Sequence, residues 1–561
     1  MRRIFAIASI LSFFVTALVQ GATQKHVVFL KDKNDNPYTL SNPSEFLTQR
    51  ALDRRARYGI ALDMYDLPVT PSYITQIAQT GAEVVYSLKW FNAVVIATDD
   101  PLILAAIAAL PFVDHIDQVL PKNPVTSDGK PGVNEISEIP PYILKKPVSV
   151  GTIKSATSLD YGQAANQTQM ISLDLLHDLG YTGSGMLIAI LDAGFYHTDQ
   201  IAAFDSLWMN NQIMGTRDFS IPGNNVFGDD MHWHGTSVLS TIGANLPGQI
   251  VGTAPDASFW LIRTEVGEYE SLIEEFNWAG GAEFADSLGV DVINSSLGYT
   301  TFDNPVYDHT YADMDGNTAP CTRAADMAAS RGMIVVNSAG NSGGDWWQYV
   351  GAPADGDSVL SIGAVDAQGN YASFSSTGPT ADGRVKPDVS AQGSGTTVVS
   401  GDGSVVQGYG TSFSSPIMAG AMTCLWQSAQ EFSAEELRNA VRNTASQSTL
   451  PDSLLGYGIP NMMNALTFLS VNSPLPATQK KFTLYPMPFS DSPWIQGNSE
   501  KSEVVRIDIF SVTGQQVSSL NFRINGSSAV LLDAFNTLPF GVYLVRVKGT
   551  SGQQMLRAVK L

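Results

Sequence analysis

The chain has 561 residues, of which 44% are apolar and only 15% are charged. This composition supplies large hydrophobic cores, argues against a disordered protein, and at this length predicts three or four domains. Lys and Arg number 32 against 53 Asp and Glu, a net charge of −21, which disfavours binding to nucleic acid or to a membrane surface.

The N-terminus has the plan of a secretory signal peptide. Arg2 and Arg3 precede an apolar run from Ile4 to about Val19, and small or polar residues follow. We therefore expect residues 1–22 to be a signal peptide. The alternative is a transmembrane anchor, but the run is short and no basic flank follows it. No later segment approaches the roughly 18 to 20 apolar residues of a membrane span, so we expect no transmembrane segment.

Residues 23–120 have the pattern of a small α+β module. Strands are expected at residues 26–31, 91–98 and 112–116, and helices at 46–58 (a basic segment) and 101–110. This alternation predicts a ferredoxin-like arrangement. Residues 121–166 are rich in Pro, Ser, Gly and Lys and lack periodicity, which predicts an exposed linker.

Residues 167–467 alternate between strands and helices, which predicts an α/β fold with a mainly parallel sheet covered by helices on both faces. Strands are expected at 186–191, 258–263, 290–295, 333–337 and 359–365, and helices at 171–179, after His234, at 269–288 and 322–331, after Ser412 and at 434–444.

After a linker at 468–480, residues 481–561 change to short alternating strands, which predicts a small antiparallel β-sandwich. These strands are expected at 482–485, 504–510, 516–520, 529–532, 542–548 and 555–560.

The segment from Gly410 to Gly420 is a glycine turn that opens an apolar helix running to about Ala429. Proline is tolerated in the first turn of a helix, so Pro416 places Ser412 at the helix N-terminus. Free N–H groups and the helix dipole favour negative charge there. A serine at this place suits nucleophilic catalysis, because the oxyanion would form beside its own N–H group. The alternative is that Ser412 only caps the helix.

Two further segments carry polar residues where catalysis is often found. The apolar strand at 186–191 leads into Asp192, and loops at the carboxyl ends of parallel strands carry the chemistry of open α/β sheets. His234 opens a helix of small residues. Together they give the order Asp, His, Ser, and the chain resembles the subtilisin-like serine peptidases. The resemblance rests on Leu191–Gly194, His234–Thr236, Asn337–Asn341 and Gly410–Pro416.

The resemblance implies a role for each of these residues. Ser412 would be the nucleophile, and His234 the general base and then the general acid. Asp192 would hold the imidazole in the right tautomer and stabilise the imidazolium. Asn341 would donate its amide to the oxyanion together with the N–H of Ser412. His232 is the rival base, but the frame His-Gly-Thr ahead of a helix selects His234.

Two short segments resemble the edges of the primary specificity pocket in that family. They are Ser296, Leu297 and Gly298 on one side and Ser338, Ala339 and Gly340 on the other. Glycine in both edges lets an extended backbone approach closely and add as a strand. We therefore expect protein or peptide substrates.

The flanking regions resemble further modules. In position and pattern, residues 23–120 look like the inhibitory propeptide of subtilisin-like peptidases, with the activation cut inside 121–166. The alternative is an accessory domain that stays attached. Tyr485–Pro488, Gly541–Val547 and Val559–Leu561 resemble the sorting domain of the type IX secretion system, although Met487 stands where that family usually has Asn. The alternative is a carbohydrate- or protein-binding sandwich.

No cofactor is required by this chemistry, and calcium is the one ion that the sequence leaves open. A loop holds Asp303, Asp308, Asp313 and Asp315 near Gly316, and hard oxygen ligands suit calcium. The alternative is a solvated acidic loop, and the pair Asp229 and Asp230 offers no stronger indication.

The two cysteines cannot form a disulfide framework, and the sequence leaves open whether they pair. Cys424 lies on the apolar helix after Ser412, which favours an inert core thiol, and Cys321 is the second cysteine.

These observations predict a serine endopeptidase that works through an acyl-enzyme and is made as an autoprocessed zymogen. We expect it to be secreted from a Gram-negative bacterium, to the cell surface or beyond, with its own propeptide and the secretion machinery as partners. One alternative is a surface binding protein or adhesin on a peptidase scaffold, which the loss of a triad residue would have favoured. Another makes the C-terminal sandwich the functional adhesin.

Overall fold

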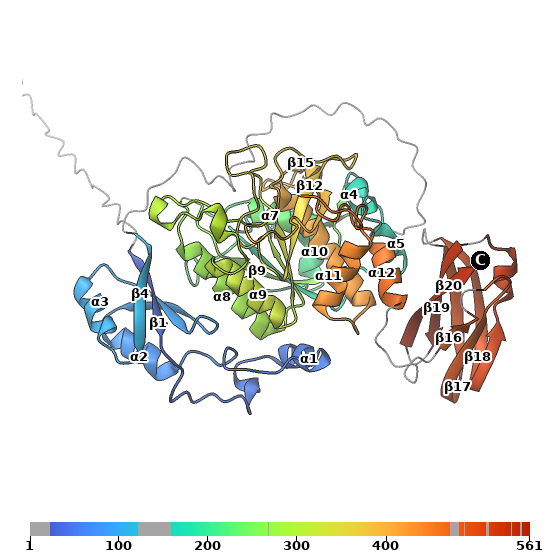
Figure 1. Ribbon diagram of the computed structural model, residues 1–561, viewed down its shortest axis with the longest axis horizontal. Coiled ribbons are helices and arrows are strands. Elements are labelled where there is room, and N and C mark those ends of the chain that lie inside the picture. The colour runs from blue at the N-terminus through green and yellow to red at the C-terminus, as the bar shows by residue number, and fades with distance from the viewer. Residues whose placement is uncertain are drawn as a thin grey trace, which may run out of the picture.

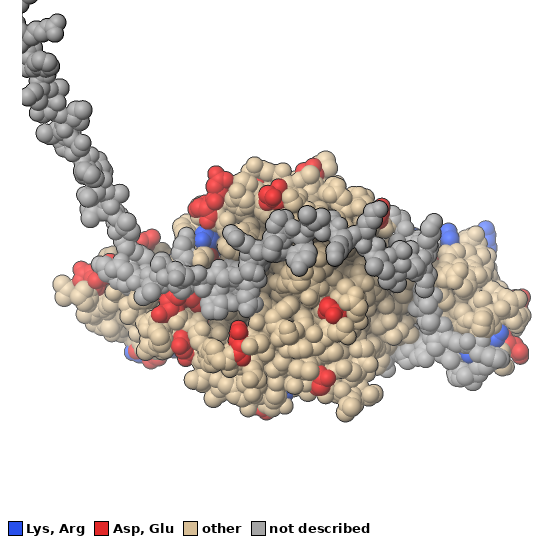
Figure 2. Space-filling model, turned by 90° about the horizontal axis from the view of Figure 1, so that it is seen from above, with Lys and Arg blue, Asp and Glu red and all other residues tan. Residues whose placement is uncertain are grey.

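The computed structural model describes residues 23–121, 159–267, 269–471, 482–486, 489–511, 515–539, 541–549 and 552–560. The expected signal peptide, residues 122–158 of the first linker, in which the activation cut is expected, and most of the second linker lie outside these residues. Figure 1 shows the described chain as a blue N-terminal module, a central α/β domain and a red strand-rich region. Within it, no helix is both long and apolar enough to cross a membrane. Figure 2 shows one face, over which Asp and Glu are scattered and Lys and Arg are few.

The N-terminal module has an antiparallel sheet in which the described strands follow the order β2-β3-β1-β4. Successive residues of β1 face opposite sides: Val28 packs with α2 and α3, whereas Val27 packs toward the central domain. The elements are β1 (Lys25–Leu30), η1 (Pro43–Glu45), α1 (Gln49–Arg57), α2 (Pro71–Gln79), β2 (Glu83–Leu88), β3 (Ala93–Ala97), α3 (Pro101–Ala108) and β4 (Val113–Leu120).

The sequence analysis missed α2 and β2. Helix α2 buries only Tyr73 and Ile77, so its apolar stripe is narrow. Strand β2 contains an irregularity between Val84 and Tyr86, which breaks the alternation by which a strand is detected.

In the central domain, seven described strands form a parallel sheet in the order β13-β12-β11-β10-β5-β9-β6. Strand β5 is buried on both faces: Ile188 and Ile190 pack with α7 and α10, and Leu187 and Leu191 pack with α8 and α9. The strands are β5 (Leu187–Asp192), β6 (Ile213–Asp218), β9 (Ser258–Arg263), β10 (Val292–Ser295), β11 (Ile334–Ser338), β12 (Val359–Val365) and β13 (Val389–Gln392).

Helices cover both faces of this sheet, as the alternation predicted (Figure 1). They are α4 (Ala165–Gln169), α5 (Asp174–Asp178), α6 (Asp205–Met209), α7 (His234–Gly243), α8 (Ile273–Leu288), α9 (Pro320–Ser330), α10 (Thr411–Ser428), α11 (Ala434–Asn443) and α12 (Met462–Val471). Two hairpins, missed by the sequence analysis, join β7 (Asn245–Leu246) to β8 (Ile250–Val251) and β14 (Ser394–Val399) to β15 (Val405–Tyr409).

The C-terminal region is strand-rich and antiparallel, as expected. Its described strands hydrogen-bond in the order β16-β17-β19-β20, with β18 beside β17. The first and last strands of this order, β16 and β20, also contact each other, because the side chain of Gln554 in β20 forms two hydrogen bonds with the backbone of Phe482 in β16. Phe510 and Leu544 belong to the same hydrophobic cluster as α12. The strands are β16 (Phe482–Tyr485), β17 (Trp494–Ser511), β18 (Gln516–Leu531), β19 (Gly541–Gly549) and β20 (Gly552–Lys560).

Both cysteines are free and buried. Burial raises the pKa of the Cys424 thiol, so this group stays protonated and inert. Its Sγ lies 3.2 Å from the carbonyl oxygen of Thr253, which also accepts a hydrogen bond from His177 Nε2 at 3.0 Å. Because a carbonyl oxygen only accepts, Nε2 carries the proton of a neutral ring, and Nδ1 accepts from the Tyr161 hydroxyl at 2.6 Å.

This buried histidine makes stability depend on pH. Burial lowers the pKa of His177 from 6.5 to about 4. Below pH 6.5 this histidine takes up a proton in the unfolded chain, whereas the folded ring stays neutral. The contribution of His177 to the free energy of unfolding is therefore fully present above pH 6.5 and is lost as the pH falls toward 4. We expect it to amount to about 3 kcal/mol.

Replacing His177 with glutamine keeps one donor and one acceptor and removes the titration. Denaturant unfolding of the Ser412→Ala chain, followed by tryptophan fluorescence, should lose more free energy between pH 7 and pH 4 than that of the same chain with His177→Gln. Equal losses would contradict a neutral buried His177.

Candidate active site

Asp192 and His234 come from different elements and meet at the carboxyl edge of the sheet. Asp192 is the last residue of β5 and is fully buried, and His234 is the first residue of α7. The distance between His234 Nδ1 and Asp192 Oδ1 is 2.8 Å. Oδ1 also accepts the N–H of Ala193, and Oδ2 has no hydrogen-bond partner among the described residues. The carboxylate therefore holds the His234 ring in one orientation through its Nδ1 atom.

Two glycines allow α7 to begin directly against the end of β5. A Cβ on Gly235 would lie 2.3 Å from the carbonyl oxygen of Gly194 and 3.0 Å from Asp192 Cβ. Gly194 itself has φ of +143°, which L side chains rarely adopt. Any side chain at Gly235 would push His234 away from Asp192.

His232, the alternative candidate for the base, forms a hydrogen bond with the backbone instead. Its Nδ1 accepts the backbone N–H of His234 at 3.2 Å, at the start of α7. The Asp192 carboxylate bonds the ring of His234, and the choice of His234 as the base stays a prediction.

Ser412 is the second residue of α10 and is 5% exposed. The rings of His234 and Phe413, the next residue after Ser412, lie 6.1 Å apart, so the start of α10 is close to His234. The Ser412 hydroxyl faces the carbonyl oxygen of Ser296 at 3.4 Å, and within the described chain no hydrogen bond joins it to His234. Catalytic hydrogen bonds are often long in free enzymes and tighten when substrate binds.

The position predicted for Pro416 was wrong in one respect. Because α10 begins at Thr411, Pro416 is the sixth residue and lies in the second turn. It cannot donate to the carbonyl four residues earlier, which is that of Ser412. The Ser296 hydroxyl donates to this carbonyl instead, at 2.9 Å. A residue of the expected pocket edge thus compensates for the proline and fixes the backbone of the candidate nucleophile.

The orientation of the Asn341 amide is set by Thr411. Asn341 Oδ1 accepts from the Thr411 backbone N–H at 2.8 Å and from its hydroxyl at 2.9 Å. The Thr411 hydroxyl in turn accepts from the N–H of Gly340 at 3.1 Å. These bonds occupy Oδ1 and fix Nδ2, the donor atom of the amide, on the other side of the group.

The two expected pocket edges lie side by side. Residues 296–298 follow β10 and residues 338–340 end and follow β11, and these strands are parallel neighbours. Asn337 Nδ2 donates to the carbonyl oxygens of Leu297 at 3.0 Å and Ser338 at 2.8 Å, so one amide sets the spacing of both edges. The sequence analysis missed Asn337 and Thr411 as positioning residues, although both lie in the motifs that it used.

The acidic loop uses its carboxylates to hold its own backbone. Asp308 accepts the N–H of Phe302, Asp313 that of Thr310, and Asp315 those of Asn317 and Thr318. Asp229 bonds His197 Nε2 at 2.7 Å. A calcium ion at these residues stays a prediction.

Three other carboxylates lie closer together than those of the loop. Glu265, Glu270 and Glu274 are buried, and their oxygens lie within 4.8 Å of one another, close enough to share a cation. Glu265 also accepts from the Tyr299 hydroxyl at 2.6 Å. Their signal in the sequence was four glutamates within residues 265–274, around the start of an expected helix.

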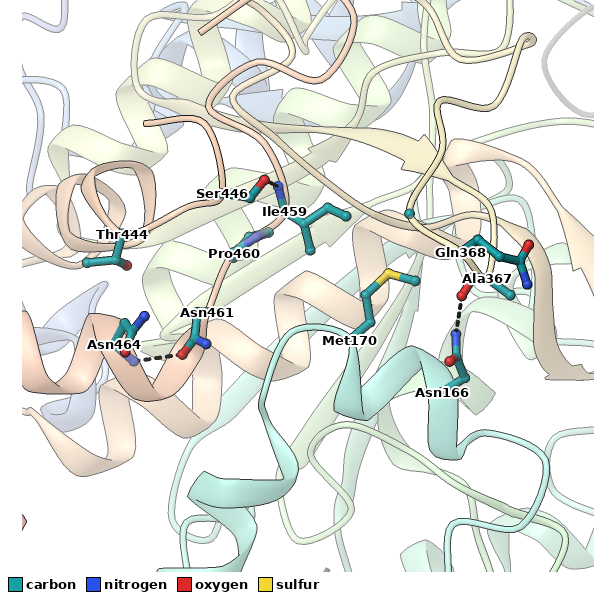
Figure 3. Close-up of a pocket in the computed structure, with 11 residues that line it drawn as sticks. Asn166, Met170, Ala367, Gln368, Thr444, Ser446, Ile459, Pro460, Asn461 and Asn464 are labelled. Atoms are coloured by element: carbon teal, nitrogen blue, oxygen red, sulfur yellow. Dashed lines mark hydrogen bonds between the residues drawn. The ribbon is translucent and has the colours of Figure 1, made fainter. Parts of the chain in front are cut away.

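A separate pocket of about 520 Å³ lies between α4, the loop after β12 and the start of α12 (Figure 3). Amides and hydroxyls line it, with Met170 and Ile459 as apolar contacts and no charged residue among its lining residues. Asn166 donates to the carbonyl oxygen of Ala367 across it, at 3.2 Å. None of the expected site residues lines this pocket.

Comparisons with known proteins match all three described regions. Residues 183–458 match the model of the Subtilase family, residues 25–131 that of the Peptidase S8 propeptide domain of Bacteroidota, and residues 483–560 that of the Secretion system C-terminal sorting domain. The chain is 32% identical to Subtilisin DY of Bacillus licheniformis over 303 residues, 52% of this chain and 95% of that protein.

Two further relatives agree. The chain is 31% identical to Subtilisin E of Bacillus subtilis over 316 residues, 54% of this chain and 72% of that protein. It is 32% identical to Subtilisin BL of Lederbergia lenta over 288 residues, 51% of this chain and 92% of that protein.

Proposed function

Because the chain belongs to the subtilase family and is a subtilisin-like serine endopeptidase with its own propeptide, we propose that it cleaves extended protein substrates through an acyl-enzyme on Ser412. The observation that carries the proposal is the buried contact between His234 and Asp192, at 2.8 Å, beside the helix N-terminus that holds Ser412. In this proposal His234 is the catalytic base, Asp192 orients it, and Ser412 supplies a hydroxyl near the positive end of a helix dipole.

In the proposed reaction, His234 Nε2 takes the proton of Ser412 Oγ as this oxygen attacks the peptide carbonyl. The oxyanion is held by Asn341 Nδ2 and the Ser412 N–H. His234 then gives the proton to the leaving amine, and the acyl-enzyme forms. Water, activated by the same imidazole, releases the acid.

The same proposal makes the chain a zymogen. The end of β4 is buried against the central domain at Val119 and Leu120, and the Ser271 hydroxyl donates to the carbonyl oxygen of Val119 at 2.7 Å. We propose that the protein cuts itself within residues 121–166. The sorting domain supports secretion through the type IX system of a Gram-negative bacterium, to the cell surface or outside.

The function is tested by incubating purified, propeptide-free protein with casein and sequencing the new termini. We expect cleavage by the wild type and none by His234→Ala. A folded, propeptide-free wild type that leaves casein intact would overturn the proposal and favour a binding protein on this scaffold.

Replacing Asn341 with alanine should lower kcat on a chromogenic peptide by about 100- to 1,000-fold, with little change in KM, because the donor acts on the transition state. Asn341→Asp is the matched variant: it keeps an oxygen that accepts from Thr411 and replaces the donor with a second acceptor. It should be at least as impaired, and a wild-type kcat for Asn341→Asp would exclude the amide as a donor.

A further inference from the structure

Residues 42–66 of the propeptide leave its sheet and run along the central domain. We call this segment, which contains η1 and α1, the arm. In Figure 1, α1 lies beneath the central domain, away from α2, α3 and β4. The arm contacts residues where β5, β10 and β11 begin, so it lies at the sheet edge opposite to the one that carries Asp192.

The arm supplies donors to backbone carbonyls at three helix ends. Arg50 Nε donates to the carbonyl oxygen of Gly289, the C-cap of α8, at 2.9 Å. Arg54 Nε donates to that of Arg331, the C-cap of α9, at 3.2 Å.

The third helix end is that of α10. The Tyr58 hydroxyl donates to the carbonyl oxygen of Gln430, just after α10, at 2.9 Å, and accepts from Trp426 Nε1 at the same distance. Helix C-termini leave carbonyls without partners and favour positive charge, so these arginines match the surface that they cover.

A buried carboxylate of the central domain depends on the propeptide. Asp286, in the last turn of α8, is fully buried and contacts Arg54 at 2.6 Å, Arg55 at 2.9 Å and Lys89 at 2.9 Å. Burial alone would raise the pKa of Asp286, but these cations hold it well below its usual range. Among the described residues, every cationic side chain that forms an ion pair with Asp286 belongs to the propeptide.

Glycines on the central domain make room for the arm. Gly289 has φ of +80°, and a Cβ there would lie 2.5 Å from the backbone nitrogen of Ala51. Gly332 has φ of +91°, and its Cβ would lie 2.7 Å from Ile60. The arm and the central domain therefore fit closely at both glycines.

We propose that the arm is a second docking element of the propeptide, remote from Ser412, and that the contacts of Arg54 and Arg55 with Asp286 set how tightly a cut propeptide is held. Trp426 lies fourteen residues after Ser412 along α10, a separation of about 21 Å. The arm can therefore occupy its site without covering Ser412. The physiological consequence, control of latency, rests on the proposed zymogen function.

The test uses the full chain with Ser412→Ala and a site for a specific protease inserted after residue 121. After cleavage, the dissociation constant of the propeptide is measured by fluorescence. Breaking a buried ion pair is costly, so Arg54→Ala and Arg55→Ala should each raise this constant on the order of a hundredfold or more. Arg57→Ala lies on the same helix, where the Arg57 side chain has an exposed contact to Gln430 and, among the described residues, no ion pair with Asp286; it should stay within about threefold of the parent.

This experiment tests the role of the arm independently of the proposed catalytic activity, because the chain used carries alanine in place of Ser412. Arg54→Ala and Arg55→Ala chains that hold the propeptide as tightly as Arg57→Ala would overturn the proposal. Tyr58→Phe removes one hydroxyl and should fold even if the arginine variants do not. It should weaken binding by about fivefold, and an unchanged constant for a folded Tyr58→Phe chain would also overturn the proposal.

Discussion

Replacing Ser412 with alanine is expected to lower kcat on a peptide substrate by on the order of a millionfold and to leave the fold intact. The hydroxyl makes only a 3.4 Å contact with the carbonyl oxygen of Ser296, so its loss costs little stability. The bond that fixes the backbone here, from the Ser296 hydroxyl to the Ser412 carbonyl oxygen, is kept.

Two companion variants sharpen this result. Ser412→Ala combined with His234→Ala should be no worse than Ser412→Ala alone, because the two residues act as a unit. Ser414→Ala is the matched control, since the Ser414 hydroxyl is buried on the same helix and donates to the carbonyl oxygen of Thr411. It should keep nearly full activity. If Ser414→Ala lost activity and Ser412→Ala kept it, the assignment of Ser412 as the nucleophile would be wrong.

Asp192→Asn should lower kcat by about 10⁴-fold near neutral pH. The asparagine NH₂ group would donate to His234 Nδ1 and leave the ring proton on Nε2, where the base must be free. The same oxygen, Oδ1, also accepts the N–H of Ala193, so an NH₂ group in its place would face that N–H as well as the ring.

The measurement for Asp192→Asn is kcat and KM against pH, with circular dichroism as the check on folding. KM should change little, because Asp192 is buried and acts through His234. A loss of less than tenfold in a folded variant would contradict the role of Asp192.

Much of the fold follows from local pattern. Strand β5 is apolar on every face because the sheet is covered on both sides, and such a run is visible in the sequence. Strand β6 was missed because it lies at the sheet edge, where most of its residues are partly or fully exposed. Strand β13 was missed because only four residues, Val389–Gln392, carry its signal.

The candidate site was predicted from a different signal. Asp192, His234 and Ser412 each lie in a short motif at the end of a strand or the start of a helix; Asp192 and His234 are in contact, and the catalytic roles of the three residues stay predictions. The contacts that position them join distant residues: Ser296 holds Ser412, and Thr411 holds Asn341. No periodicity within either segment reports such a pairing.

The arm shows most clearly that a local sequence pattern does not reveal contacts between distant residues. Arg54 and Arg55 read as part of a basic helix, and basic side chains are usually exposed. Both are buried, because Asp286 lies beside them and is more than 200 residues away in the chain. The charge pattern of a segment therefore predicted the helix and not its partner.

The central claim is that Ser412 is the nucleophile activated by His234. It is tested most directly by treating folded, propeptide-free protein with a fluorophosphonate and mapping the modified peptide by mass spectrometry. The account predicts one adduct, on Ser412, which is lost in His234→Ala. An adduct on another residue, or none on the folded wild type, would contradict it.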